Sequence, residues 1–188
     1  MKIAIIGWGS LIWDPRDLPK EGIWQEDGPE LPLEFSRISR DARLTLVIDQ
    51  TDGKIIKALH VLSPRTSLDD ACEDLRKREG IPNKKSIGWV DIVKKTDSYL
   101  TCREQANVHE IVEKWCIEHR YDAAVWTALP SNFKKETGKD FSDTAALEYL
   151  TSLPRNVCKE ALRYIRNAPD CIDTPVRKVV EKRFGELC

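Results

Sequence analysis

The stretch KIAIIGWGSLIW, residues 2–13, decides how the fold begins. Its first part, Lys2–Ile6, is a short apolar run rich in β-branched residues, which predicts a buried strand. Gly7 and Gly9 follow, so we expect the strand to break into a tight loop. Successive backbone N–H groups in such a loop can form a concave anion-binding site. A plain tight turn without a ligand is the alternative.

The residues after the two glycines argue against a dinucleotide-binding loop. That loop would have glycine in place of Ile12, a helix directly afterwards and an acid about twenty residues further on. Asp14-Pro15 follows instead. Residues 14–32 contain four prolines and two glycines, which predicts a long irregular connection in place of the helix.

Ser10 is not marked as a nucleophile by its surroundings in the sequence. A Gly-x-Ser-x-Gly elbow is absent, and no histidine stands nearby. A serine hydrolase would therefore need His60 or His109 to be brought to Ser10 by the fold.

The remaining elements follow from apolar periodicity and from turn signals. Strands are predicted over Leu33–Ser39, Arg43–Asp49, Ile55–Leu62, Ile87–Val93 and Ala123–Leu129. Helices are predicted over Leu68–Glu79, Glu104–Arg120, Thr144–Leu153, Arg155–Asn167 and Pro175–Phe184. Because strands joined by hairpins come first and most helices come late, the pattern indicates an α+β fold. We divide the chain into an α+β domain, residues 1–140, and a helical C-terminal extension packed on it, residues 141–188.

The bulk composition shows no strong bias of charge or hydrophobicity. The chain has 188 residues, of which 41% are hydrophobic and 32% charged, and this argues against a membrane protein. Its 30 Lys and Arg nearly balance 31 Asp and Glu, so there is no electrostatic reason to expect nucleic acid or an anionic membrane as partner. The six cysteines form no Cys-x-x-Cys pair, which predicts reduced thiols and no zinc site. Since residues 2–13 lack a signal-peptide cleavage site before Asp14-Pro15, we expect a cytoplasmic protein.

A second motif, Arg78-Glu79-Gly80, stands at the end of a predicted helix. A carboxylate at a helix C-terminus opposes the macrodipole, so Glu79 is disfavoured there unless another group holds it. Such a carboxylate, placed beside apolar walls, is suited to proton transfer. The alternative is an exposed Glu79 paired with Arg76 or Lys77 on a solvated face.

Aromatic and basic residues close to these motifs are further candidates. Trp8, Trp13 and Trp24 flank the glycine loop and are placed to wall a pocket, whereas Trp115 and Trp126 follow core patterns. Three arginines near predicted strand ends, Arg37, Arg40 and Arg43, are candidates for orienting a substrate carboxylate, with a solvated basic edge as the alternative.

The two motifs together resemble one enzyme family. Residues 7–13, Gly-Trp-Gly-Ser-Leu-Ile-Trp, resemble the Gly-Tyr-Gly-Ser-Leu-Ile-Trp signature of γ-glutamylcyclotransferases, especially the glutathione-degrading ChaC type. Further along, Arg37–Arg40, Leu44–Val47 and Arg78-Glu79 resemble the arginine-rich strand, the Thr-Leu-Val stretch and the helix-terminal Arg-Glu of that family. The likeness covers about residues 3–80, and Trp8 stands where the family has tyrosine.

The resemblance implies an activity and a set of site residues. The α-amine of a γ-glutamyl group would attack its own γ-carbonyl and release an amine and 5-oxoproline, with no metal or cofactor. Glu79 would be the general acid and base, and the amides of Gly9, Ser10 and Leu11 would hold the glutamyl group. The full set implied for binding a small γ-glutamyl substrate is Gly7, Trp8, Gly9, Ser10, Leu11, Ile12, Trp13 and Arg43.

The resemblance also refines the expected fold and leaves one functional alternative. It implies a mixed, strongly curved sheet or partial barrel with flanking helices. We expect its strands to be Lys2–Ile6, Leu33–Ser39, Arg43–Asp49, Ile55–Leu62 and Ala123–Leu129, with the helix Leu68–Glu79 over one end. The functional alternative is a non-catalytic protein on the same fold that binds a small molecule or a peptide.

Overall fold

Two β-sheets organise the chain, and each belongs almost wholly to one of two structural units. The computed structural model describes residues 1–98 and 106–185. Unit 1 comprises Met1–Leu31 and Lys57–Leu129, and unit 2 comprises Pro32–Ile56 and Pro130–Cys188. The helices after residue 140 belong to unit 2, and the predicted domain boundary at residues 140 and 141 stays a prediction.

Unit 1 is built on a mixed sheet, which has six strands among the described residues. In order across the sheet these are β2 (Glu21–Gln25), β6 (Leu59–Leu62), β1 (Ile3–Gly7), β9 (Ala123–Thr127), β7 (Ile87–Asp91) and β8 (Thr96–Asp97). β1 runs parallel to β9, and every other neighbouring pair is antiparallel. All five residues of β1 are buried, which explains its continuous apolar run, since a central strand is covered on both faces.

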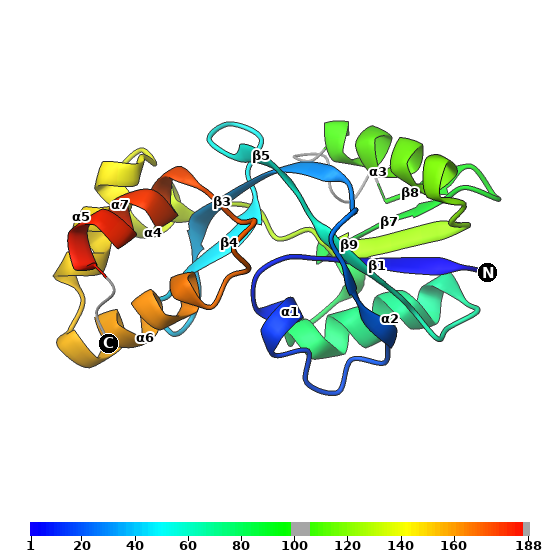
Figure 1. Cartoon of the computed structure of the whole chain (residues 1–188), viewed down its shortest axis with the longest axis horizontal. Coiled ribbons are helices and arrows are strands. Elements are labelled where there is room, and N and C mark those ends of the chain that lie inside the picture. Colours follow the sequence, from blue (N-terminus) through cyan, green and yellow to red (C-terminus); the bar gives the residue numbers. More distant parts are fainter. Residues whose placement is uncertain (99–105, 186–188) are drawn as a thin grey trace. The chain divides into compact units, whose positions relative to one another are not determined.

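Helices α2 (Leu68–Glu79) and α3 (Ala106–His119) lie on opposite faces of this sheet (Figure 1). The strand register agrees with that arrangement. Ile5 and Val61 are directly opposite each other in β1 and β6, and both pack in the core cluster that includes Leu75 of α2. His60, the residue before Val61, contacts Trp115 of α3 instead. The alternation of side chains along β6 therefore assigns one face to each helix.

Unit 2 combines a three-stranded sheet with four helices in its described part. The sheet has the order β4 (Leu44–Ile48), β3 (Glu30–Ile38) and β5 (Lys54–Lys57), and the helices are α4 (Phe133–Thr137), α5 (Asp143–Ser152), α6 (Arg155–Arg166) and α7 (Pro175–Phe184). The Thr174 side chain caps α7 by accepting the amide of Arg177. The buried Glu34 carboxylate accepts the amide of Val176 in the first turn of the same helix, and burial raises the pKa of Glu34.

The α+β class and most element positions agree with the sequence-based expectation, but the expected single sheet is wrong. β3, β4 and β5 form a sheet of their own, apart from β1 and β9. The predicted strand Ile55–Leu62 is interrupted at Ala58, which lies between β5 and β6. The backbone of Ala58 is hydrogen-bonded to that of Gly28 and Pro29. The expected cover of one sheet end by Leu68–Glu79 is also wrong, since α2 packs on β1, β7 and β9.

The predicted irregular connection over residues 14–32 is likewise wrong in part. It contains β2, an edge strand, and the first residues of β3. β2 shows no alternation of buried and exposed side chains. Trp24 is half-buried, and the other four residues of the strand are exposed. No helix in the described part of the chain is long and apolar enough to span a bilayer.

Gly88 provides a test of the packing between β7 and β9. Gly88 lies opposite Trp126, and a Cβ atom on Gly88 would clash with the fully buried indole ring. We expect Gly88→Ala to lower the free energy of unfolding by about 3 kcal/mol, at the upper end of the range for overpacking. The exposed Thr66→Ala is the control and should change it by less than about 0.5 kcal/mol. Equal urea midpoints for the two variants would contradict the described packing.

Candidate functional site

The glycine motif forms a turn at the end of β1 in which the two glycines have different roles. Gly9 has a φ of 61°, which glycine adopts without strain, and a single helical turn, α1 (Ser10–Trp13), follows directly. Gly7 lies under the indole of Trp24, because a Cβ atom on Gly7 would be 2.7 Å from the Trp24 ring. We expected an irregular connection and no helix after the glycines, and this is wrong for the one helical turn of α1.

The second motif ends α2 abruptly at Glu79. Gly80 adopts the left-handed conformation with φ 65°, and its amide donates to the carbonyl of Lys77 at 3.1 Å. The amide of Ile81 reaches the carbonyl of Arg76 at 3.1 Å, and the Ile81 side chain is buried in the core cluster of unit 1. This pairing satisfies the last carbonyls of the helix and turns the chain sharply.

The Arg78 guanidinium joins the two motifs. Its Nη1 donates to Glu79 Oε1 at 2.6 Å, and its Nη2 donates to the carbonyl of Asp14 at 2.6 Å and to Ser10 Oγ at 3.3 Å. In return, Arg16 Nη1 donates to the carbonyl of Arg78 at 3.2 Å. The side chain of Arg78 is 4% exposed and that of Glu79 is 18% exposed, so the pair lies largely away from solvent.

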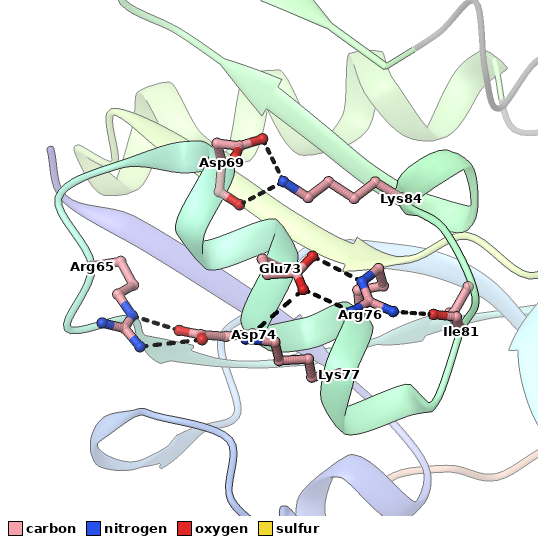
Figure 2. Close-up of polar contacts among 8 residues, drawn as sticks. All are labelled: Arg65, Asp69, Glu73, Asp74, Arg76, Lys77, Ile81 and Lys84. Carbon is pink, nitrogen blue, oxygen red and sulfur yellow. Dashed lines mark hydrogen bonds and ion pairs between the residues drawn. The ribbon is translucent and has the colours of Figure 1, made fainter.

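Glu79 is not the exposed surface acid that the alternative interpretation requires. Arg76 and Lys77 both pair with Glu73 (Figure 2), and the N–O distances are 2.7 and 3.8 Å. Hydrogen bonds from Arg76 lower the pKa of Glu73 to about 2. The other acids drawn there, Asp69 and Asp74, pair with Lys84 and Arg65. Glu73 is therefore paired within α2, Asp69 and Asp74 are paired by cations outside the helix, and Glu79 is paired separately with Arg78.

The other residues predicted for the site divide into three groups. Gly7, Trp8, Gly9 and Leu11 are buried, while Ser10, Ile12 and Trp13 are half-buried. Ser10 and Leu11 begin α1, where backbone amides have no intrahelical acceptor. Arg43 belongs to unit 2, where it pairs with Asp41 at 2.8 Å and lies over the Tyr164 ring. A substrate-binding role of Arg43 stays a prediction.

The contacts of Ser10 do not support a serine nucleophile. Within the described residues, the side-chain partner of Ser10 is the Arg78 guanidinium. The two ring nitrogens of His60 are bonded to Asp27 and Tyr121, and His109 Nε2 lies 2.9 Å from Ser98 Oγ. No imidazole of the described chain is bonded to the Ser10 hydroxyl.

A second polar cluster, which the sequence did not indicate, surrounds His60 on the α3 side of the sheet. Nε2 of His60 is 2.7 Å from Asp27 Oδ1, and Nδ1 is 3.1 Å from the Tyr121 hydroxyl. Trp115 donates its indole N–H to the carbonyl of Asp27 at 2.8 Å and stacks with both Tyr121 and His119. Asp27, His60 and the segment 115–121 lie far apart in the chain, so no local pattern joins them.

Comparisons with known proteins do not identify a relative. No protein-family model matches the chain, and no curated protein or solved structure matches it. In the described part of the chain, no group of three or more His, Cys, Asp or Glu side chains is arranged to hold a metal ion. The functional interpretation therefore depends on the geometry around Arg78 and on the sequence of the two motifs.

The His60 cluster predicts a pH dependence of stability. Burial lowers the pKa of His60, although the hydrogen bond and charge of Asp27 oppose this, and the charges of His119 and Lys2 add to it. Folding favours the neutral ring. The stability that His60 contributes is therefore fully present above its unfolded pKa of about 6.5, and it is lost as the pH falls below that value. We expect the urea concentration at the unfolding midpoint to decrease as the pH is lowered from about 7.5 to about 5.5.

The variant His60→Gln should flatten this dependence, since it removes the titrating group. His119→Gln is the control, because His119 is partly exposed and should leave most of the slope in place. An unchanged slope in His60→Gln would show that another group is responsible.

Proposed function

We propose that the chain is a γ-glutamylcyclotransferase-like enzyme that converts a γ-glutamyl amide or peptide to 5-oxoproline and a free amine. The observation that supports this most directly is the meeting of its two motifs, 68 residues apart, at the Arg78 guanidinium. The proposal includes the finer fold assignment, a strongly curved sheet of the γ-glutamylcyclotransferase type.

The proposed reaction is an intramolecular transfer in which no water is consumed. The α-amine nitrogen of the glutamyl group bonds to its own γ-carbonyl carbon, and the bond from that carbon to the leaving nitrogen breaks. Glu79 takes a proton from the attacking amine and returns one to the departing amine, so the carboxylate is regenerated. Because nucleophile and electrophile belong to one molecule, the protein contributes mainly by holding the substrate folded back on itself.

The geometry of Glu79 suits this role. Within the described residues, Oε1 accepts a hydrogen bond from Arg78, and Oε2 has no hydrogen-bond partner. One carboxylate oxygen is thus fixed, and the other is available to exchange a proton. The partial exposure of the side chain, 18%, keeps it accessible to a small substrate.

The glycine turn is assigned to substrate binding on the strength of its sequence. The positive φ of Gly9 directs the chain from β1 into α1, which presents the amides of Ser10 and Leu11 at the start of a helical turn. Amides in that position favour a carboxylate or a carbonyl oxygen as ligand. Trp8 is buried, so the place of the family's tyrosine is taken here by an indole that packs in the protein.

Glu79→Gln tests the proposed function. The amide keeps the size of the side chain and an acceptor for Arg78 but cannot take up a proton, so folding should survive and turnover should fall about 10²–10⁴-fold. The assay follows release of 5-oxoproline from a panel of γ-glutamyl amides and peptides that includes glutathione. Glu73→Gln is the matched control on the same helix, and it should retain full turnover because Glu73 pairs only on the solvated face.

Two results would count against the assignment in different ways. A wild-type protein that releases 5-oxoproline from no compound of the panel would favour the alternative, a non-catalytic binding protein. An active wild type whose Glu79→Gln variant turns over normally would require another acid. Asp14 would be examined first, since its carbonyl accepts from Arg78 and its side chain is exposed, and the buried Glu34 of unit 2 would follow.

A further inference from the structure

Arg78 is a cation in the last turn of α2 that is buried, whereas charged side chains are seldom fully buried. Its side chain is 4% exposed, and a buried guanidinium is stable only when acceptors and an opposite charge surround it. In the described part of the chain, Glu79 is the one acid within ion-pair distance, and the other acceptors are the Asp14 carbonyl and the Ser10 hydroxyl.

The contact between Arg78 and Glu79 is unusual for consecutive residues. Side chains at positions i and i+1 of an α-helix do not face each other, because they are about 100° apart around the axis. Here Nη1 and Oε1 are nevertheless 2.6 Å apart. Glu79 is the last residue of α2, so its carboxylate is free to bend toward Arg78, and it is drawn to the side on which the α1 turn lies.

We propose that Arg78 is the positioning residue of the site: it holds the Glu79 carboxylate in one orientation against the α1 turn. This inference rests on the proposed function of Glu79. Without the guanidinium, the three side-chain torsions of a terminal glutamate would sample several rotamers, and only a fraction would direct Oε2 at a substrate. Misplacement of a catalytic group by about 1 Å can reduce turnover about 10²-fold.

The role requires the shape of arginine as well as its charge. Nη1 serves Glu79, while Nη2 serves Ser10 and Asp14, and Nε has no hydrogen-bond partner within the described chain. The bridge therefore depends on two nitrogens held in one plane at a fixed separation. A lysine ammonium is a single point of charge and cannot reproduce this arrangement.

Arg76 provides a matched control two residues earlier on the same helix. Like Arg78, it makes three hydrogen bonds, in this case two to Glu73 and one to the carbonyl of Ile81, as Figure 2 shows. These contacts stabilise the outer face and the end of α2, and none of them reaches Glu79. Loss of Arg76 therefore reports the structural cost of removing an arginine here, without the proposed positioning effect.

The test compares Arg78→Ala, Arg78→Lys and Arg76→Ala in the 5-oxoproline assay, with thermal unfolding of each variant as a measure of folding. We expect Arg78→Ala to lower kcat about 10²-fold with little change in KM, because the substrate-binding amides remain. Added guanidinium, below denaturing concentrations, should restore part of kcat in Arg78→Ala and none in Glu79→Gln. Arg76→Ala should keep the wild-type kcat even where its unfolding temperature falls.

The outcomes separate the two proposals. Wild-type protein without activity overturns the proposed function, and with it the role of Arg78. An active wild type, an inactive Glu79→Gln and an Arg78→Ala with normal kcat overturn the role of Arg78 alone. If Arg78→Ala does not fold, Arg78→Lys decides: a fall in kcat of about tenfold or more supports positioning, and an unchanged kcat overturns it.

Discussion

The burial of β1 on both faces of the six-stranded sheet is the constraint on which the rest of unit 1 depends. α2 and α3 lie on opposite faces of this sheet, and β1 has no solvent-facing positions. All its residues must therefore be apolar or glycine. The chain leaves this buried position through Gly7 and Gly9, and it therefore emerges beside the end of α2. That placement brings the Ser10 hydroxyl within reach of Arg78.

Helix α2 separates its charges into two sets with different physical roles. On the outer face, Asp69, Glu73 and Asp74 pair with cations in exposed or half-exposed contacts, and such pairs contribute little to stability. At the C-terminal end, Arg78 and Glu79 are largely withdrawn from water. A pair of that kind is costly to assemble and more costly to break on one side, so its burial is weak evidence for a role in stability.

Much of the fold could be predicted from local patterns, and the errors have a common physical cause. The bounds of α7 were predicted correctly because Pro175 and the capping Thr174 mark its start and Gly185 follows its end. The strands of unit 2 were located within a few residues, yet their sheet was not, since alternation specifies which residues are buried and not which strand is the neighbour. β2 escaped detection because an edge strand with one half-buried residue leaves no periodic signal.

The sequence by itself determined the two motifs and their local forms. A β-branched run ending in glycines gives a strand and a turn, and Gly80 ends a helix at Glu79, because backbone sterics act over a few residues. Only the tertiary structure decided which groups Arg78 meets beyond its own helix, the Ser10 hydroxyl and the Asp14 carbonyl. It also decided that His60 is bonded to Asp27 and Tyr121. The pairings of Arg78 with Ser10 and of His60 with Asp27 and Tyr121 join residues distant in the chain. Their partners are set by how helices and strands pack, which no short-range pattern encodes.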